Sequence, residues 1–221
     1  MVSRYKLYSI TLVSAAMILM LVNIVGAAPF TYVANTNDNT ISVINTSTNN
    51  ITATVNVGSA PVGLVVTPDR TRVYVANSGS NDVSIINTGT NTVISTIPVG
   101  TYPWGIEVTP DGTRIYVTNE EDNTVSVIDN ATKSITATVN VGIAPIGIAV
   151  IPNGSKIYVA NSQDNTASVI DTTTNTVVAT VSVGNHPFAV SASTDGTRVY
   201  VTNIDGTIST IRTSNDKITY T

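Results

Sequence analysis

Side chains that could perform catalysis are sparse in this sequence. His186 is the only histidine among 221 residues, and there is no cysteine. One histidine cannot supply a multi-histidine copper or zinc site, and the lack of cysteine excludes thiolate ligands and thiol nucleophiles. A Ser-His-Asp triad is not indicated either, because His186 has no obvious partner in the sequence. We therefore expect no metal and no cofactor, with His186 as an ordinary loop residue.

The densest acidic cluster is Glu120-Glu121-Asp122. Carboxylates grouped in a loop can bind a hard cation such as Ca²⁺, although this spacing matches no EF-hand. The alternative is structural: Asp38, Asp122 and Asp164 each precede an asparagine, and such side chains commonly accept backbone hydrogen bonds in turns. We favour the structural interpretation.

Two bulky aromatic residues interrupt an otherwise aliphatic pattern. Trp104 and Phe188 stand where comparable segments have Val62 and Ile146, and Tyr102 lies beside Trp104. Aromatic and polar groups around a shallow cavity suit a sugar or a peptide. The alternative is that these rings fill space between unequal units, so the elements that hold them matter.

Those elements follow an internal repeat of 42 residues. Tyr-Val-Ala/Thr-Asn occurs five times at this step, and a Val-Gly pair followed three residues later by proline keeps the same step. Repeats of this length are typical of solenoids and propellers. The five copies begin at Tyr32, Tyr74, Tyr116, Tyr158 and Tyr200, and we expect these tyrosines to be core residues.

Each unit is predicted to form four short strands. In one unit these are residues 104–108, 114–118, 124–128 and 135–141, with a Pro-Asp-Gly turn after the first. The last strand alternates apolar and polar residues, whereas the first two are apolar on both faces. A sheet whose inner half is buried and whose outer strand has one solvent-exposed face predicts a β-propeller blade. Small residues are expected near the crowded axis, and Gly63, Gly105 and Gly147 fit that position. A parallel β-helix is the alternative, although its coils are usually shorter.

The repeat resembles that of the YVTN β-propeller family. The resemblance is carried by Tyr-Val-Ala/Thr-Asn, then Asp-Asn-Thr-Val-Ser-Val-Ile-Asp, then Val-Gly-x-x-Pro-x-Gly, and it covers residues 29–221. Archaeal surface-layer-type proteins and bacterial periplasmic relatives carry this repeat. The resemblance implies an all-β propeller of four-stranded antiparallel blades. Family members commonly close with seven blades, whereas this sequence predicts about five.

The phase of the repeat leaves one strand missing. Three strands precede Pro61, complete blades begin at Pro61, Pro103 and Pro145, and a last unit begins at Pro187 with Ala189 in the glycine position. Three arrangements are compatible with this count. The chain forms an imperfect five-bladed ring, it is part of a larger ring, or open arcs self-associate through their blade edges. Of these we favour a compact five-blade arrangement.

In a propeller, the loops entering the inner strands and the loops after the tyrosine strands lie at one end of the channel. The residues that depart from the repeat would then ring one channel mouth as a ligand-binding site: Tyr102, Trp104, Glu120, Glu121, Asp122, His186 and Phe188.

The N-terminus predicts export. Arg4 and Lys6 precede the apolar stretch of residues 7–25, and small residues follow at Gly26-Ala27. This pattern is typical of a signal peptide, residues 1–27, ahead of a propeller domain of residues 28–221. An uncleaved membrane anchor is the alternative. We expect a secreted or cell-surface protein that contacts the membrane only if this segment is retained.

Composition narrows the partners further. The net charge is −4, and basic clusters are lacking, which argues against nucleic acid as a partner. Four Asn-x-Ser/Thr sequons fall in predicted turns and are candidates for glycosylation: Asn45, Asn50, Asn130 and Asn153.

The sequence thus predicts a non-enzymatic exported module of surface-layer or cell-surface type, serving protein interaction, adhesion or envelope structure, with a protein or glycan as partner. The alternative is a propeller enzyme or a metal- or cofactor-binding protein of the lactonase, quinone or copper type acting at the channel mouth. Such sites need several converging polar groups, and the inner strands offer Glu107 and little else.

Overall fold

A computed structural model describes residues 30–221, which form five antiparallel sheets in chain order and contain no helix. Blade 1 has three strands, β1 (Phe30–Asn35), β2 (Thr40–Asn45) and β3 (Asn50–Asn56). Blade 2 has β4 (Pro61–Val66), β5 (Arg72–Asn77), β6 (Asp82–Asn87) and β7 (Thr92–Pro98). Blade 3 has β8 (Pro103–Val108), β9 (Arg114–Asn119), β10 (Thr124–Asp129) and β11 (Ser134–Asn140).

Blade 4 has β12 (Pro145–Val150), β13 (Lys156–Asn161), β14 (Thr166–Asp171) and β15 (Thr176–Ser182). Blade 5 has β16 (Pro187–Ala192), β17 (Arg198–Asn203), β18 (Ile208–Arg212) and β19 (Lys217–Tyr220). The predicted four-stranded unit is confirmed, and the antiparallel pairing of consecutive strands rules out the parallel β-helix.

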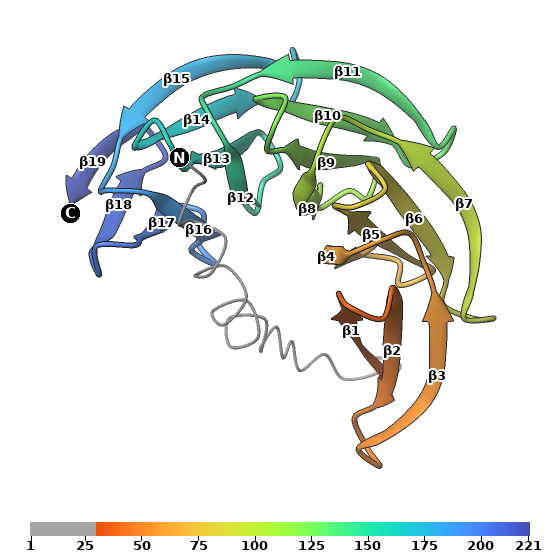
Figure 1. Cartoon of the computed structure of the whole chain (residues 1–221). Helices are drawn as coiled ribbons and strands as arrows, with labels where there is room; N and C mark the ends of the chain where they lie inside the picture. The colour runs from red at the N-terminus through yellow and green to blue at the C-terminus, as the bar shows by residue number, and fades with distance from the viewer. Residues whose placement is uncertain (1–29) are drawn as a thin grey trace, which may run out of the picture.

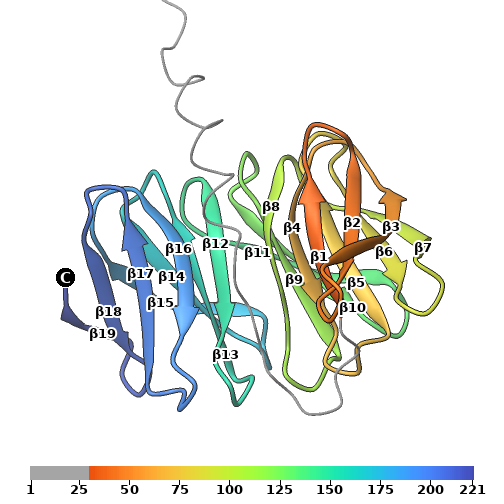
Figure 2. The same ribbon diagram turned by 90° about the horizontal axis from the view of Figure 1, so that it is seen from below.

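The blades stand side by side as an open arc (Figure 1). Strands β4, β8, β12 and β16 lie on the inside of the arc, and β3, β7, β11, β15 and β19 lie on the outside (Figures 1 and 2). Blades 1 and 5 are the two ends, and they do not meet. The prediction of about five blades, incomplete as a ring, is confirmed. The closed form of the compact arrangement favoured above is not formed by the described residues, because closing the ring would require blades 1 and 5 to pack together as the interior blades do.

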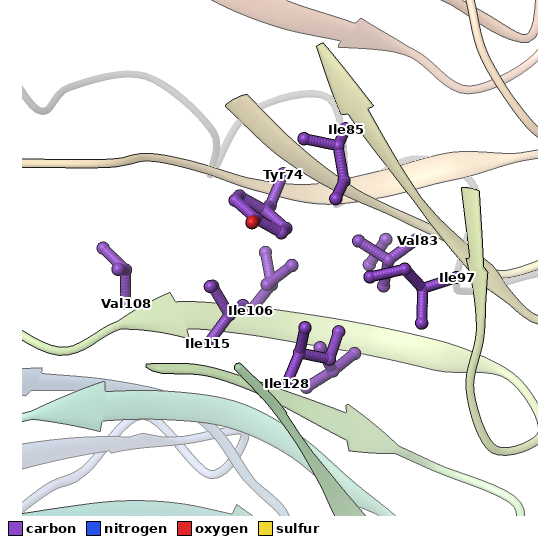
Figure 3. Close-up of a cluster of buried hydrophobic side chains, with 10 residues drawn as sticks. Tyr74, Val83, Ile85, Ile97, Ile106, Val108, Ile115 and Ile128 are labelled. Atoms are coloured by element: carbon purple, nitrogen blue, oxygen red, sulfur yellow. The ribbon is translucent and has the colours of Figure 1, made fainter. Parts of the chain in front are cut away.

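Four apolar cores hold the arc together, one between each pair of neighbouring blades. Figure 3 shows the core between blades 2 and 3, where Tyr74, Val83 and Ile85 of blade 2 face Ile106 and Ile115 of blade 3. Tyr74, Ile85 and Ile115 are fully buried. In the interior blades, the neighbouring blades therefore bury both faces of the second strand, which explains why that strand is apolar on both faces.

Close approach of the inner strands explains the glycine that follows the recurring proline by two residues in blades 2, 3 and 4. A Cβ at Gly63 would lie 2.2 Å from the carbonyl oxygen of Trp104 in the next blade. The corresponding distances are 2.3 Å from Gly105 to the oxygen of Ile146 and 2.3 Å from Gly147 to that of Phe188. No side chain fits at this separation, so the expected crowding at the axis is confirmed.

The recurring tyrosines differ according to their neighbours. Tyr74, Tyr116 and Tyr158 are fully buried, as expected of core residues. Tyr200 is 37% exposed, since no blade of the described chain follows blade 5. Tyr32 is partly buried against the core between blades 1 and 2. The expectation of a core tyrosine is therefore wrong for Tyr200.

The predicted signal peptide, residues 1–27, lies outside the described residues. Between residues 30 and 221, no helix has the length and apolar character needed to cross a membrane.

Candidate functional site

The loops that enter the inner strands and the loops after the tyrosine strands lie together at one end of the arc. The backbone N–H of Glu120 donates to the carbonyl oxygen of Tyr102 at 3.0 Å, and that of Ile204 donates to the oxygen of His186 at 3.2 Å. We call this end of the channel the mouth. Because backbone hydrogen bonds join two loops of one blade there, residues that are not adjacent in the sequence share one surface.

The residue before each recurring proline has a left-handed backbone held by an asparagine of the preceding blade. Tyr102 has φ 56°, and its N–H donates to Oδ1 of Asn81 at 2.9 Å. His186 has φ 49°, and its N–H donates to Oδ1 of Asn165 at 2.9 Å. A positive φ is uncommon for bulky residues, so the clamp stabilises the loop conformation that carries Tyr102. Asn39 and Asn123 make the same bond in their loops.

Three of the predicted site residues form one aromatic group. The rings of Tyr102 and Trp104 stack with centroids 5.9 Å apart and an interplanar angle of 27°. Trp104 also meets the ring of Phe188 edge-on, with centroids 6.5 Å apart and an angle of 77°. Trp104 belongs to blade 3 and Phe188 to blade 5, so the group joins two blades past the smaller Ile146 of blade 4. We call Tyr102, Trp104 and Phe188 the aromatic trio.

Trp104 and Phe188 of the trio border a cavity of about 260 Å³ on the inner strands. Apart from the two rings of Trp104 and Phe188, its walls are mainly aliphatic side chains and glycine backbone, for example Val62, Ile146 and Gly147. Such a lining is apolar and lies next to the polar loops of the mouth. A larger hollow of about 730 Å³ lies between β15 and β19, where the outer strands of blades 4 and 5 splay apart.

Carboxylates lie next to the trio. Burial raises the pKa of Glu120, and the neighbouring charge of Glu121 raises it further. The pKa of Tyr102 is also raised, first by burial and then by the charges of Glu120 and Glu121. Both acids therefore lie near enough to Tyr102 for their charges to disfavour ionisation of its hydroxyl. The aromatic trio thus has an acidic rim.

The other predicted site residues have structural contacts. Oδ2 of Asp122 accepts the N–H of Thr101 at 2.7 Å, and Asp164 accepts the N–H of Ile143 at 2.6 Å in the next blade. Asp122 is therefore a loop-bracing residue, as the structural interpretation expects. His186 is exposed, and its Nδ1 lies 2.9 Å from Oδ1 of Asn185.

Glu107 lies deeper on β8, opposite Tyr116 of β9. It occupies the repeat position of Val65, whose side chain packs into the core between blades 2 and 3. Burial raises its pKa to about 7, only partly offset by a hydrogen bond from the N–H of Val108 at 3.2 Å. Across residues 30–221, no three His, Cys, Asp or Glu side chains gather in a group that could hold a metal ion.

The sequons lie on turns at the end opposite the mouth, in different environments. Asn50 and Asn153 are exposed, and Oδ1 of Asn45 accepts the N–H of Ser47. Asn130 is the residue whose role the sequence did not reveal. Its Oδ1 accepts from Arg72 and from the hydroxyl of Tyr74, both of blade 2, and its Nδ2 donates to Gly112 at 2.7 Å. The Asn130 side chain therefore links blade 2 to blade 3 by hydrogen bonds.

Comparisons with known proteins agree with this architecture. The chain is similar in structure to hydrazine synthase of Kuenenia stuttgartiensis (TM-score 0.78, 20% identity), with 91% of this chain and 68% of that one covered. It is also similar to a functionally unknown protein of Desulfotomaculum acetoxidans (TM-score 0.77, 22% identity), with 86% and 64% covered. At these identities the likeness shows the fold, and this chain spans about two thirds of each.

A search of curated proteins finds no match. The family model of the YNCE-like beta-propeller matches residues 7–112 and 69–155, which together exceed half of the chain and agree with the YVTN-type repeat. The chain therefore belongs to the YNCE-like β-propeller family.

Proposed function

We propose that this protein is a non-enzymatic binding module outside the cytoplasm, and that its channel mouth binds a glycan of the cell surface. The observation that carries the proposal is the contact of Tyr102, Trp104 and Phe188 beside an apolar cavity. These are residues at which the units differ, whereas the scaffold around them repeats.

The chemistry of the mouth suits a sugar ring. Flat aromatic surfaces pack against the C–H face of a pyranose, and polar groups at the rim fix its orientation through the hydroxyls. Glu120 and Glu121 supply acceptors at that rim. The cavity of about 260 Å³ is close to the roughly 300 Å³ at which small-ligand pockets begin, whereas folded proteins bind to broad surfaces that bury about 800 Å² on each partner. The dimensions favour a short glycan over a folded protein at this site.

The wider role follows from the scaffold and the N-terminal sequence. A propeller of repeated blades that carries one ligand site, with an export segment ahead of it, fits adhesion or envelope structure at the cell surface. Within residues 30–221 the mouth has a single histidine, His186, and it contacts only the neighbouring Asn185 through its ring. No nucleophile is paired with a base there.

Trp104 is the only tryptophan in the chain, so its fluorescence reports directly on the mouth. Titration with neutral and amino-sugar oligosaccharides is expected to shift or quench its emission at saturating ligand. Phe188→Ile, which copies Ile146 at the equivalent position, is expected to fold normally and to bind at least about tenfold more weakly. Tyr102→Ala, which copies Ala60, should also weaken binding.

Two outcomes contradict the proposal. One is that no oligosaccharide tested changes the Trp104 emission and that calorimetry detects no binding of any of them. The other is turnover of a lactone or a glycan by the purified protein, which would favour the enzyme alternative.

A further inference from the structure

Within residues 30–221 blade 1 has no inner strand, and the geometry points to a slot there that takes an extended strand from another polypeptide. In blades 2 to 5 an inner strand pairs with the tyrosine strand: β4 with β5, β8 with β9, β12 with β13 and β16 with β17. β1 pairs only with β2 within the described chain, so its inner edge has no strand partner. Unpaired N–H and C=O groups along such an edge are a template for strand addition.

The slot has a second wall as well as the open edge. β4 of blade 2 packs beside β1, as β8 packs beside β5. Leu64 on β4 is partly exposed, whereas Ile106 and Ile148 at the equivalent positions are 7% and 8% exposed. An apolar strand in the slot would bond to β1 along its edge and cover Leu64.

The neighbouring blade also dictates what the strand must contain. Each inner strand that precedes another blade has glycine where it passes the next blade, because a Cβ there would lie 2.2 to 2.3 Å from a backbone carbonyl oxygen. By the same relation, a strand in this slot passes the carbonyl of Val62. Its chemistry is therefore that of the inner strands themselves: an extended apolar segment of the form Pro-x-Gly followed by aliphatic residues.

The sequence that the repeat would place there does not meet this requirement. A step of 42 residues back from Pro61–Val66 leads to residues 19–24, which carry Leu21 at the glycine position. A leucine side chain cannot stand where a Cβ already collides with the backbone. A separate polypeptide with the Pro-x-Gly pattern meets the requirement.

The other end of the arc differs. On the free face of blade 5, Ala189 replaces the glycine, Ser191 stands where blade 2 has Val65, and Thr210 stands where blade 2 has Ile85. A further blade stacked in the usual way would bring a carbonyl oxygen against the Cβ of Ala189, and it would meet a more polar surface. Polar residues on a terminal face are typical of a capping repeat. The strand-accepting end is therefore blade 1.

The test uses the full chain and a synthetic peptide of residues 143–152, which contains β12, with two added lysines for solubility. Binding is measured by fluorescence polarisation, and hydrogen exchange is followed at residues 30–35. The peptide is expected to slow exchange of the β1 amides at least about tenfold while leaving β5 unchanged. The matched peptide with Gly147→Ala is expected to bind at least about tenfold more weakly.

Three results would overturn the proposal. The first is that β1 amides exchange slowly in the protein alone, which would show that the edge is already covered by the chain or by a second copy. The second is equal binding of the glycine and alanine peptides, which would show non-specific adhesion. The third is peptide binding that leaves exchange at β1 unchanged, which would place the peptide elsewhere.

Discussion

The hydroxyl of Tyr158 in blade 4 donates to Oδ1 of Asp216 in blade 5, at 2.5 Å. The other carboxylate oxygen of Asp216 lies 2.7 Å from Nζ of Lys156. The same joint recurs with a neutral partner one blade earlier, where Tyr116 donates to Oδ1 of Asn175 at 2.8 Å. Each joint ties the buried tyrosine of one blade to the outer turn of the next.

Replacing Asp216 should therefore loosen blade 5. Asp216→Ala leaves the Tyr158 hydroxyl and the Lys156 ammonium without their acceptor, and we expect a loss of about 2 kcal/mol in the free energy of unfolding. Asp216→Asn, which copies Asn175, should retain the tyrosine bond and lose less than about 1 kcal/mol. Urea unfolding of the three proteins measures this order. Equal losses in both variants would show that the tyrosine bond contributes nothing.

Gly105 should not tolerate a side chain, although its backbone φ is not left-handed. Its Cβ would lie 2.3 Å from the carbonyl oxygen of Ile146 and 3.0 Å from Cγ2 of Ile148. We expect Gly105→Ala to cost at least about 2 kcal/mol of unfolding free energy, because backbone must move apart. The control is Ala189→Gly at the equivalent position of blade 5, which should change stability by less than about 1 kcal/mol. A Gly105→Ala protein as stable as the wild type would contradict the close approach.

How far the fold could be predicted from sequence depends on what each residue has as a neighbour. The strands of blade 3 were predicted to within one or two residues, because turns such as Pro110-Asp111-Gly112 punctuate every repeat. Closure was not predictable. Whether Tyr200 is buried depends on what covers blade 5, and its Tyr-Val-Thr-Asn motif is identical to that of the buried Tyr116.

The candidate site shows the same division. Trp104 and Phe188 stand out as departures from the repeat, but their contact across Ile146 depends on the curvature of the arc. The asparagine clamps were open to prediction, since Asn39, Asn81, Asn123 and Asn165 recur at the 42-residue step. The role of Asn130 was not, because its partners Arg72 and Tyr74 come from the preceding blade, more than 50 residues earlier.

Glu107 should make stability depend on pH near neutrality. Its pKa in the folded protein is about 7, against 4.5 for an ordinary glutamate, so the folded state retains a proton that the unfolded chain has released. The contribution of protonated Glu107 to stability is therefore fully present below pH 4.5 and is lost as the pH rises through 7, by about 3 kcal/mol. Glu107→Val, which copies Val65, should melt several degrees higher than the wild type at pH 8.

The control for this effect is Glu120, whose pKa is also raised. Glu120→Gln should keep the pH dependence that Glu107 causes, because Glu120 lies at the mouth and not in the interblade core. Melting temperatures of the wild type and both variants between pH 4.5 and 8 separate the contributions. A Glu107→Val protein whose melting temperature still follows that of the wild type across this range would assign the pH dependence to another group.

The clamp from Asn81 should control the aromatic trio. Asn81 itself has φ 59°, so Asn81→Gly keeps the backbone conformation and removes only the acceptor of the Tyr102 N–H. We expect Tyr102 to leave its stacked position on Trp104, with loss of most of the near-ultraviolet circular dichroism of the single tryptophan. Asn39→Gly removes the same bond to Ala60, away from the trio, and both variants should lose about 1 kcal/mol of stability. The two variants lose the same hydrogen bond and differ only in the residue that is released, Tyr102 or Ala60. Loss of the tryptophan signal in Asn81→Gly alone would show that the Asn81 clamp positions Tyr102 on Trp104. Loss of the signal in both variants would indicate general loosening of the arc.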